Sequence, residues 1–437
     1  MRVRTQKTIC IGLSLSPTWV STQSAKQDPN QREAILNPSY YIALSKRAEA
    51  AKLDFLFRPD AQFLNIDKGN QAPAFGGIDP SLLIASIAHA TNHIGFVSTI
   101  SALFYPPYIA ARQLQSLNWI TNGRVGWNIV TALKGQQNFG LKTLPDSEER
   151  YEIAKEFTAV VEALWASNPN SQPDQYQSSE SRYSGSSIQQ INHQGRYFNV
   201  EGPLNIPAYS QPIPYFQAGA SPAGRDFAAA VADGIFAATP DIDCAIEFYQ
   251  DIQRRVVSAG REPNAVKVLP GLSFYLADSR AEAYRLFEQT HANADSRTKF
   301  RYIESLINLD LSQLPIDTVI TPEMLPEGTE APYSQTHAQL LRRYICQHQP
   351  TIQMLLSAPE VNGSSHWRVI GTVSDLVDEI ERWTNKQACD GFIALPCGSE
   401  QSLTLFLEQV VPKLVEKGIF RANYQQQTLW ERLQSVG

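Results

Sequence analysis

Residues 123–134 read GRVGWNIVTALK, and this stretch decides how the chain is interpreted. Its second half is rich in β-branched residues, so we expect it to form a strand. A buried strand of a parallel sheet is usually hydrophobic almost throughout. Here Asn128 and Thr131 interrupt the apolar run near its end, and the polar sequence KGQQN follows. Polar groups at the carboxyl end of a strand are typical of barrels that bind a ligand there.

The same kind of segment recurs along the chain, alternating with helical patterns. We expect strands at 9–15, 53–57, 94–100, 125–131, 212–219, 234–238, 267–277 and 389–396. We expect helices at 39–51, 80–91, 107–121, 148–167, 222–232, 240–258, 279–291, 373–386 and 400–416. Alternating strands and helices indicate a parallel sheet. Eight repeats favour the α/β class and a closed (β/α)8 TIM barrel over an open sheet.

The amino terminus permits a second interpretation. The basic MRVRTQK, the mildly apolar ICIGLSLSPTWV and the small residues of STQSA together imitate a secretory signal. However, the apolar part is short and is broken by serines and Pro17. Its larger apolar residues alternate with smaller ones, as in a strand. We therefore favour a first barrel strand, with a cleaved signal as the alternative.

Two long stretches do not fit the repeat. Residues 168–200 are polar and rich in Ser and Gln before an aromatic, hairpin-like piece, and residues 292–368 contain mixed helix and a Pro-rich stretch. Loops of this length in a compact fold are usually lids, binding elements or disordered segments. We expect a single domain over 1–437, with both stretches as insertions over the carboxyl-terminal mouth of the barrel.

The composition limits the classes of partner and the kinds of site that we expect for this protein. The 437 residues carry a formal net charge of −6, which argues against nucleic acid or an anionic membrane surface. No apolar run approaches the ~20 residues of a membrane-spanning helix. The five cysteines are scattered without a CxxC pair, which fits a reducing, cytoplasmic compartment. We expect no metal site, and the sequence contains no GxSxG, GxGxxG or Walker motif.

The segment QAGASPAGRDFAA has the character of an anion site. Small residues before Ser221 let the backbone approach a ligand closely, and a helix is expected to begin at Pro222 or Ala223. Free N–H groups and the positive end of the helix dipole then favour a phosphate, with Arg225 one turn further on. Ser221 could equally be a simple helix N-cap. The two roles are compatible.

Several blocks of the sequence resemble a known family. GRVGWNIVTA, LFYPPYIAARQLQSLNWITNGR, HQGRYFNVEGPLNIP, FQAGASPAGRDFAA and VIGTVSDLVDEIERW are similar to the bacterial-luciferase-like flavin-dependent monooxygenases. The most similar branch holds nitrilotriacetate monooxygenase component A, dibenzothiophene-sulfone monooxygenase and long-chain alkane monooxygenase. The resemblance covers nearly the whole chain. It implies reduced FMN as cofactor, a separate NAD(P)H:flavin reductase, O2 and a small organic molecule as substrates, and a homo-oligomer.

The resemblance also implies roles for individual residues. Asp60 falls where the family places an acid near the flavin ring. Thr99 and Asn128 occupy the strand ends that contact the ring and the ribityl chain. Tyr151 matches a tyrosine on the phosphate or ribityl side, and Ser221 matches the serine that meets the phosphate.

Some positions depart from the family or leave alternatives open. Ser147 stands where the family commonly has a histidine at the flavin. His366 or His193 could act as a general acid or base, and we take Asn128 and His366 as the catalytic candidates. Aromatic residues expected near the mouth, Phe104, Tyr105 and Trp127, suit an uncharged or thioether-like substrate, but they equally suit plain packing. Two alternatives remain, a deazaflavin-dependent oxidoreductase of the same fold and a catalytically degenerate flavin-binding barrel.

Overall fold

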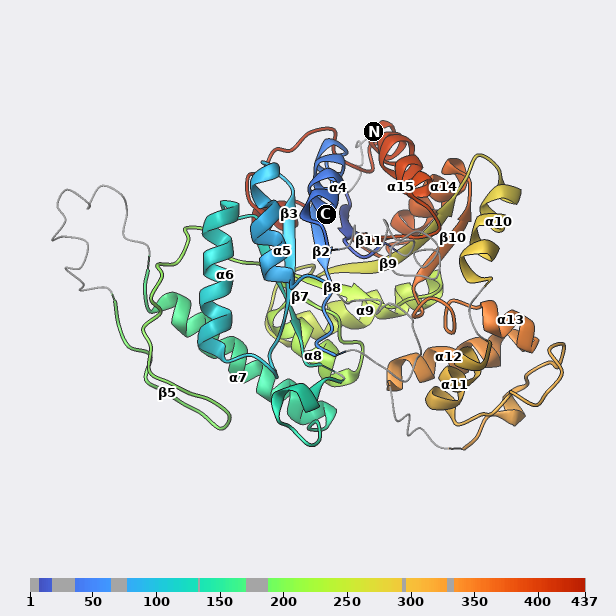
Figure 1. The fold of residues 1–437 in the computed structure, drawn as a ribbon, viewed down its shortest axis with the longest axis horizontal. Helices are drawn as coiled ribbons and strands as arrows, with labels where there is room; N and C mark the ends of the chain where they lie inside the picture. Colours follow the sequence, from blue (N-terminus) through green and yellow to red (C-terminus); the bar gives the residue numbers. More distant parts are fainter. Residues whose placement is uncertain are drawn as a thin grey trace.

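Eight parallel strands close into a barrel in this computed structural model, which describes residues 8–17, 36–63, 77–132, 134–169, 188–292, 296–327 and 334–436 (Figure 1). The barrel strands are β1 (Cys10–Ser14), β2 (Phe55–Arg58), β3 (Gly95–Ser101), β4 (Val125–Val130), β7 (Tyr215–Gln217), β8 (Gly234–Ala237), β9 (Lys267–Leu276) and β11 (Gly391–Pro396). Each pairs with the next, β8 pairs with β9, and β9 pairs with β11, which returns to β1. The predicted (β/α)8 barrel is therefore confirmed.

Helices surround the barrel and follow its strands. They are α4 (Pro38–Ala50), α5 (Pro80–Ile87), α6 (Pro107–Thr121), α7 (Ser147–Ala166), α8 (Pro222–Val231), α9 (Ile242–Ser258), α10 (Arg280–His291), α14 (Val373–Asn385), and α15 (Glu400–Leu405), which continues through a π turn into α16 (Val411–Glu416). Their starts carry local signals. At α5, for example, the Asp79 carboxylate accepts from the amides of Ser81 and Leu82, and Pro80 occupies the first turn.

Alternate strand residues point into the barrel, where they form an apolar lower layer. Phe55, Val97, Phe216 and Leu269 share one buried cluster inside the sheet. Leu429 belongs to the same cluster and comes from the short helix α17 (Leu429–Gln434) near the end of the chain. This helix closes the amino-terminal end of the barrel, so the carboxyl-terminal end is left as the mouth.

A buried ion pair ties this closing segment to the sheet. The Asp54 carboxylate, 0% exposed, lies 2.7 Å from the Arg421 guanidinium, whose side chain is 11% exposed. The other Asp54 oxygen accepts from the Ile11 amide at 2.7 Å. Arg432, also fully buried, donates to the Asp54 carbonyl oxygen at 3.3 Å. Strands β1 and β2 and the carboxyl-terminal segment are thereby joined at one carboxylate.

The second predicted insertion contains a small helical unit with its own core. Helices α11 (Ser296–Ile307), α12 (Gln335–His348) and α13 (Ile352–Ser357) pack around a separate buried cluster. The chain then forms β10 (Trp367–Gly371), which pairs with the carboxyl-terminal half of β9. This strand was not predicted from the sequence, because its first two residues fall at the end of the predicted insertion 292–368 and its last three directly follow it.

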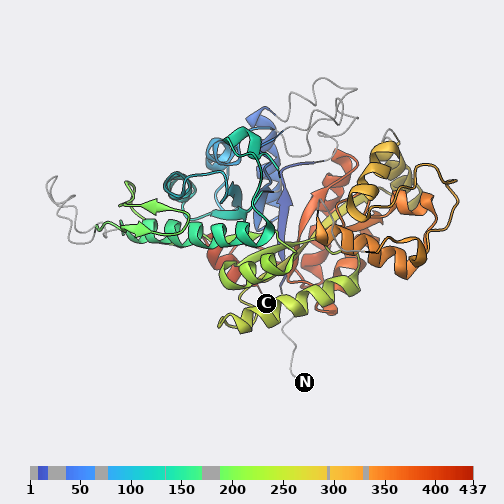
Figure 2. The ribbon, with the colours of Figure 1, turned by 90° about the horizontal axis from the view of Figure 1, so that it is seen from below.

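The described part of the first predicted insertion is a small hairpin, β5 (His193–Gln194) and β6 (Asn199–Val200). The Glu156 carboxylate on α7 accepts from the amides of Arg196, Tyr197 and Phe198 and so holds the hairpin to that helix. The hairpin and the helical unit α11–α13 lie at opposite ends of the molecule's long axis (Figures 1 and 2). The remaining residues of this predicted insertion, 170–187, lie outside the described residues.

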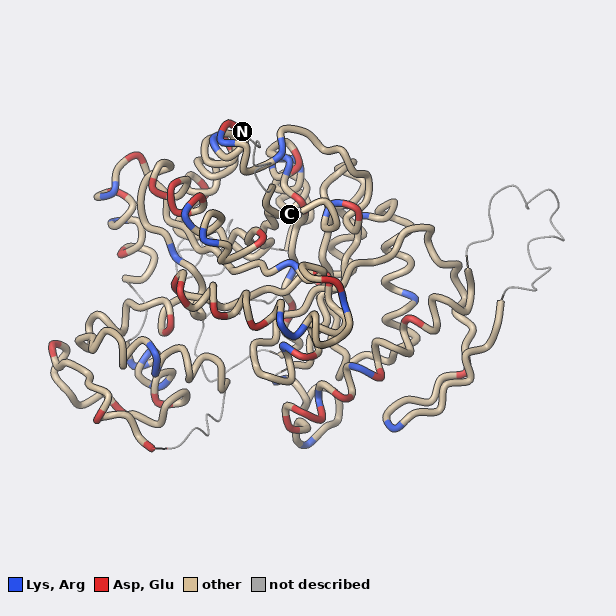
Figure 3. Tube along the Cα trace, turned by 180° about the vertical axis from the view of Figure 1, so that it is seen from behind, with Lys and Arg blue, Asp and Glu red and all other residues tan. Residues whose placement is uncertain are grey.

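Charges of both signs are interspersed along the described chain (Figure 3). Several form ion pairs between neighbouring helices, for example Arg343 of α12 with Glu247 of α9. None of the helices in the described ranges is both long and apolar enough to cross a membrane.

Replacing Arg421 with Met should destabilise the protein by about 3 kcal/mol, because it leaves the Asp54 carboxylate buried without its counter-charge. The thermal unfolding midpoint of the purified protein measures this effect. As a control, Lys155→Met removes an exposed ion pair with Glu152 and should change the midpoint little. An equal fall of the unfolding midpoint in the two variants would contradict the role given to the buried Asp54–Arg421 pair in closing the barrel.

Candidate active site

Asn128 carries an unused acceptor inside the mouth of the barrel. Its neighbours Trp127 and Ile129 pack in the outer core, so Asn128, 3% exposed, points inward. The Asn128 Nδ2 donates to Thr99 Oγ1 at 3.0 Å, and the Thr99 hydroxyl donates to the Arg58 carbonyl oxygen at 2.8 Å. Asn128 Oδ1 is buried and has no hydrogen-bond partner among the described residues. Buried polar atoms are rarely left unpaired, so this oxygen marks a place for a ligand donor or a water.

A second polar group gathers where β4 and β7 end. The Tyr151 hydroxyl accepts from Gln217 Nε2 at 3.2 Å. Burial raises the pKa of Tyr151, and the side chains of Gln217, Thr131 and Ser221 near its hydroxyl oppose that effect. Gly219 makes room for the ring, since a Cβ there would lie 2.0 Å from the Tyr151 oxygen. Three hydroxyls and one amide therefore converge on one part of the rim.

Helix α8 begins directly beside these hydroxyls. Ser221 is its N-cap and accepts from the Gly224 amide at 3.2 Å. Pro222 has no N–H, and no acceptor is found for the Ala223 amide within the described part of the chain. The free amide and the helix dipole favour an anion at this end of the helix. Both roles considered for Ser221, N-cap and neighbour of an anion, are compatible with this geometry.

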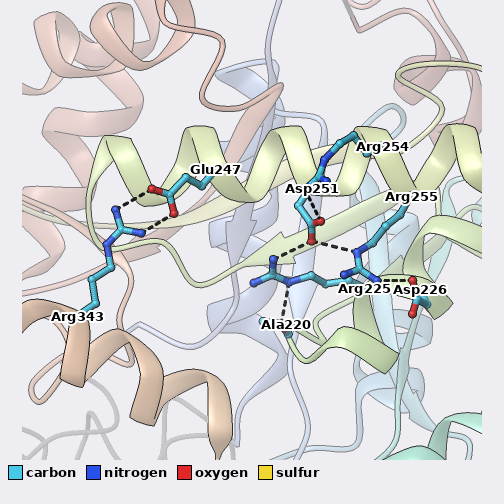
Figure 4. A network of polar contacts seen from close by, with 8 residues as sticks. All are labelled: Ala220, Arg225, Asp226, Glu247, Asp251, Arg254, Arg255 and Arg343. Carbon is cyan, nitrogen blue, oxygen red and sulfur yellow. Dashed lines mark hydrogen bonds and ion pairs between the residues drawn. The ribbon is translucent and has the colours of Figure 1, made fainter.

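Arg225 does not point its charge at this helix end in the way the sequence suggests. Its Nε donates to the Ala220 carbonyl oxygen at 2.9 Å, and its Nη1 pairs with the Asp251 carboxylate at 2.9 Å (Figure 4). Asp251 also pairs with Arg254 and Arg255 on its own helix. An anion at Ser221 would therefore be held by amides and hydroxyls more than by this guanidinium.

The other cofactor candidates lie on neighbouring parts of the rim. Asp60 follows β2 and is partly buried, and burial together with the nearby Asp79 raises its pKa. Ser147 is the first residue of α7, after its N-cap Asp146. It therefore lies one turn before Tyr151 on the same face of the helix.

His366 enters the mouth from the loop before β10. Its ring stacks on Phe236 at 5.0 Å between centroids, and a Cβ on Gly271 would lie 2.5 Å from His366 Nδ1. Phe236 and Gly271 belong to strands β8 and β9, so His366 lies on the side of the barrel formed by those strands. Burial, with a smaller contribution from His337, lowers the pKa of His366 to about 4. The imidazole is therefore neutral at pH 7.

His193, the other histidine considered for acid–base work, lies elsewhere. It is on the β5–β6 hairpin, and its Nε2 is 3.1 Å from the Glu156 carboxylate of α7. This contact anchors the hairpin to the outer helix.

Sequence reasoning missed two groups at the mouth. Gln217 ends β7 and links Tyr151 to the Gly219 amide. The one sequence signal for this role is that Gln217 is a polar residue at the end of an apolar strand. Tyr275 is the second-last residue of β9, and its hydroxyl is 2.9 Å from His291 Nε2 of α10. No local pattern could have paired those two residues.

A model of the luciferase-like monooxygenases matches residues 18–327. The chain belongs to this family. It is 34% identical to nitrilotriacetate monooxygenase component A of Aminobacter aminovorans over 90% of this chain and 89% of that protein. It is 31% identical to N-acetyl-S-(2-succino)cysteine monooxygenase of Bacillus subtilis over 98% and 96%. The chain is thus a flavin-dependent monooxygenase by family, as its sequence blocks suggested.

Solved structures agree with this assignment. The fold matches riboflavin lyase, solved with modified FMN and riboflavin, with a TM-score of 0.82 and 26% identity over 98% of this chain and 96% of that one. An F420-dependent secondary alcohol dehydrogenase matches with a TM-score of 0.56 at 15% identity, over 95% of this chain and all of that one. At that identity the likeness shows the fold alone.

The Gly219→Ala variant should bind flavin at least about tenfold more weakly, because the added methyl group displaces the Tyr151 hydroxyl from the rim. Flavin fluorescence quenching measures the affinity. Gly363→Ala is a suitable control, because a Cβ there meets its nearest neighbour at an ordinary 3.5 Å. Unchanged affinity in Gly219→Ala would contradict the arrangement described for Tyr151.

The depressed pKa of His366 predicts a pH dependence of stability. In the unfolded chain a histidine titrates near 6.5, so between about pH 4 and 6.5 the unfolded state binds more protons than the folded state. This contribution to stability is complete above about pH 6.5 and is lost as the pH falls towards 4. The thermal midpoint should therefore fall less between pH 7.5 and 5.0 in His366→Phe than in the wild type. An equal fall in both proteins would contradict the buried, neutral imidazole.

Proposed function

We propose that this chain is the oxygenating component of a two-component monooxygenase. It binds reduced FMN supplied by a separate NAD(P)H:flavin reductase and inserts one oxygen atom of O2 into a small organosulfur, amine or alkane-like molecule. We also propose that it works as a homo-oligomer, with 1–437 as a single domain and the segments about 168–200 and 292–368 as insertions.

The observation that carries the proposal is the open Asn128 Oδ1. This buried oxygen lies on the same rim as the hydroxyls of Tyr151 and Ser221 and the amino end of α8. FMN has a flat ring edged with hydrogen-bonding groups and a phosphate at the end of a polar chain. A buried amide that fits a ring edge and a helix end that fits a phosphate match those two ends of one ligand.

The relatives support the reaction and the partner. The similar proteins of Aminobacter and Bacillus are monooxygenases, and the name component A implies a second component. The solved riboflavin lyase holds a modified FMN in the same fold. A deazaflavin cofactor and a degenerate flavin-binding barrel remain the alternatives. The second is favoured only by Ser147, which stands where the family commonly has a histidine.

Each candidate residue has a defined task in this proposal. When bound, reduced flavin supplies the electrons that activate O2. Thr99 and Asn128 orient its ring, and Asp60 lies beside that ring.

At the other end, Tyr151 and Ser221 hold the phosphate, with Ser147 one turn away on α7. The neutral imidazole of His366, whose Nδ1 has no partner among the described residues, would form a hydrogen bond with the substrate. The apolar lower layer of the barrel excludes water from beneath the site.

Asn128→Leu should weaken FMN binding about tenfold, because leucine is similar in size to asparagine but lacks the amide that hydrogen-bonds the flavin ring. The fold should persist, since Thr99 keeps its bond to the Arg58 carbonyl oxygen. Fluorescence titration with FMN measures the effect.

Asn118→Leu is a matched control. Asn118 is also a fully buried asparagine with an unpartnered Oδ1, but it lies on α6, outside the sheet. Its replacement should leave FMN affinity unchanged. If both variants bound FMN as the wild type does, the proposed position of the flavin ring at Asn128 would be wrong.

The reaction itself is tested with purified protein, FMN, NADH, a generic flavin reductase and ¹⁸O2. Organosulfur, amine and alkane compounds are offered, and products are analysed by mass spectrometry. The proposal predicts a product that carries one ¹⁸O atom. Tight FMN binding without a labelled product from any compound favours the degenerate barrel, and a preference for deazaflavin over FMN favours the other alternative.

A further inference from the structure

Two cations lie together where the helical unit α11–α13 meets the barrel. Lys299 of α11 donates from Nζ to the Leu356 carbonyl oxygen at 3.1 Å. Arg368 of β10 donates from Nη2 to the Ser357 carbonyl oxygen at 2.8 Å. Leu356 and Ser357 are the last two residues of α13, so both cations are fixed beside the same helix end. We call Lys299 and Arg368 the cation pair.

The cation pair has no matching negative charge. Across the described ranges of the chain, neither residue forms an ion pair with a carboxylate, and Arg368 Nη1 is buried without a hydrogen-bond partner. The two charges also act on each other and on His291. Burial, then Lys299 and Arg368, lower the pKa of His291 to about 4, and burial, then Arg368, lower the pKa of Lys299. Partly buried cations without a counter-ion are costly and are usually compensated by an anion.

Glu360 is the acid that acts on Arg368, and it does not supply this compensation. It is 3% exposed, and its Oε2 has no hydrogen-bond partner within the described residues. Burial raises the pKa of Glu360 to about 7, so near neutral pH the group is only partly ionised. At most one negative charge therefore faces two positive ones.

The cation pair borders the barrel mouth. The groups that raise the pKa of Arg368 are Tyr275, Glu360, Cys397 and Tyr344. Tyr275 is the second-last residue of β9, and Cys397 follows β11, so both come from the carboxyl-terminal rim. The positive charge is therefore on the part of the rim formed by β9 and β11, away from Thr99 and Asn128 on β3 and β4.

We propose that the cation pair binds a carboxylate of the substrate, so that the substrate is a small organic acid. This inference rests on the proposed function and adds the substrate class to it. It differs from the uncharged or thioether-like substrate that the aromatic residues suggested, because an uncharged molecule would leave the cation pair without a counter-charge. The organosulfur, amine or alkane-like part of the molecule would then carry the reacting atom.

The test uses succinate as the probe and dimethyl succinate as its uncharged analogue. Each is titrated calorimetrically into the purified full-length protein, with and without FMN. Succinate should bind saturably and dimethyl succinate should not. Lys299→Met should weaken succinate binding at least about tenfold, since a charge-assisted hydrogen bond is lost, and Lys299→Arg should restore most of it.

Lys386→Met is the control, because Lys386 is an exposed lysine at the end of α14. It should bind succinate as the wild type does. The proposal is overturned if succinate does not bind, if the diester binds equally well, or if Lys299→Met binds succinate unchanged. The comparison of acid and diester on the wild type decides the matter even if Lys299→Met fails to fold.

FMN affinity measured on the same samples separates this inference from the proposed function. Protein that binds FMN but not succinate refutes the carboxylate site and leaves the proposed function standing. Protein that binds succinate but not FMN refutes the proposed function and leaves the carboxylate site standing.

Discussion

Closure of the parallel sheet is the constraint on which the rest of this structure depends. Backbone pairing of Gly234–Ala237 with Lys267–Pro270 joins β8 to β9 and makes the sheet continuous. Because all eight strands run the same way, closure brings their carboxyl ends to one rim. Asn128 of β4, Gln217 of β7 and Tyr275 of β9 are far apart in sequence and meet at one opening for this reason alone. Helix α17 closes the opposite end, and the buried pair of Asp54 and Arg421 ties the closing segment to the sheet, so ligands have access from one side.

The interior of the barrel changes character along its axis. The lower layer is apolar and sealed by α17, whereas the upper layer holds amides and hydroxyls that are only partly satisfied. The unpartnered Asn128 Oδ1 and Arg368 Nη1 both lie towards the upper end. Such atoms reduce the stability of the empty protein, and functional sites commonly carry this cost. The same atoms give the rim its capacity to bind a polar ligand.

Local sequence patterns were sufficient for the barrel but not for the site. Strand and helix periodicity predicted all eight barrel strands. The polar residues of the block around Asn128 were expected at the carboxyl end of a strand, and Asn128 lies near the end of β4. Strand β10 was missed because its residues, Trp367 to Gly371, follow a long irregular stretch that hid its pattern. The ion pair that neutralises the Arg225 charge could not be predicted either, since its partner Asp251 lies on the next helix and no local spacing links the two residues. The cation pair, Lys299 with Arg368, likewise exists only after the helical unit folds against β10.

The central claim is that the polar rim at β3, β4 and β7 is one continuous flavin site, with the ring at Asn128 and the phosphate at the start of α8. A crystal structure of the protein with FMN tests this most directly. The account predicts an isoalloxazine ring within hydrogen-bonding distance of Asn128 Oδ1 and a phosphate on the Ser221 hydroxyl and the Ala223 amide. A flavin bound elsewhere, or with its phosphate at Asn128, would contradict it.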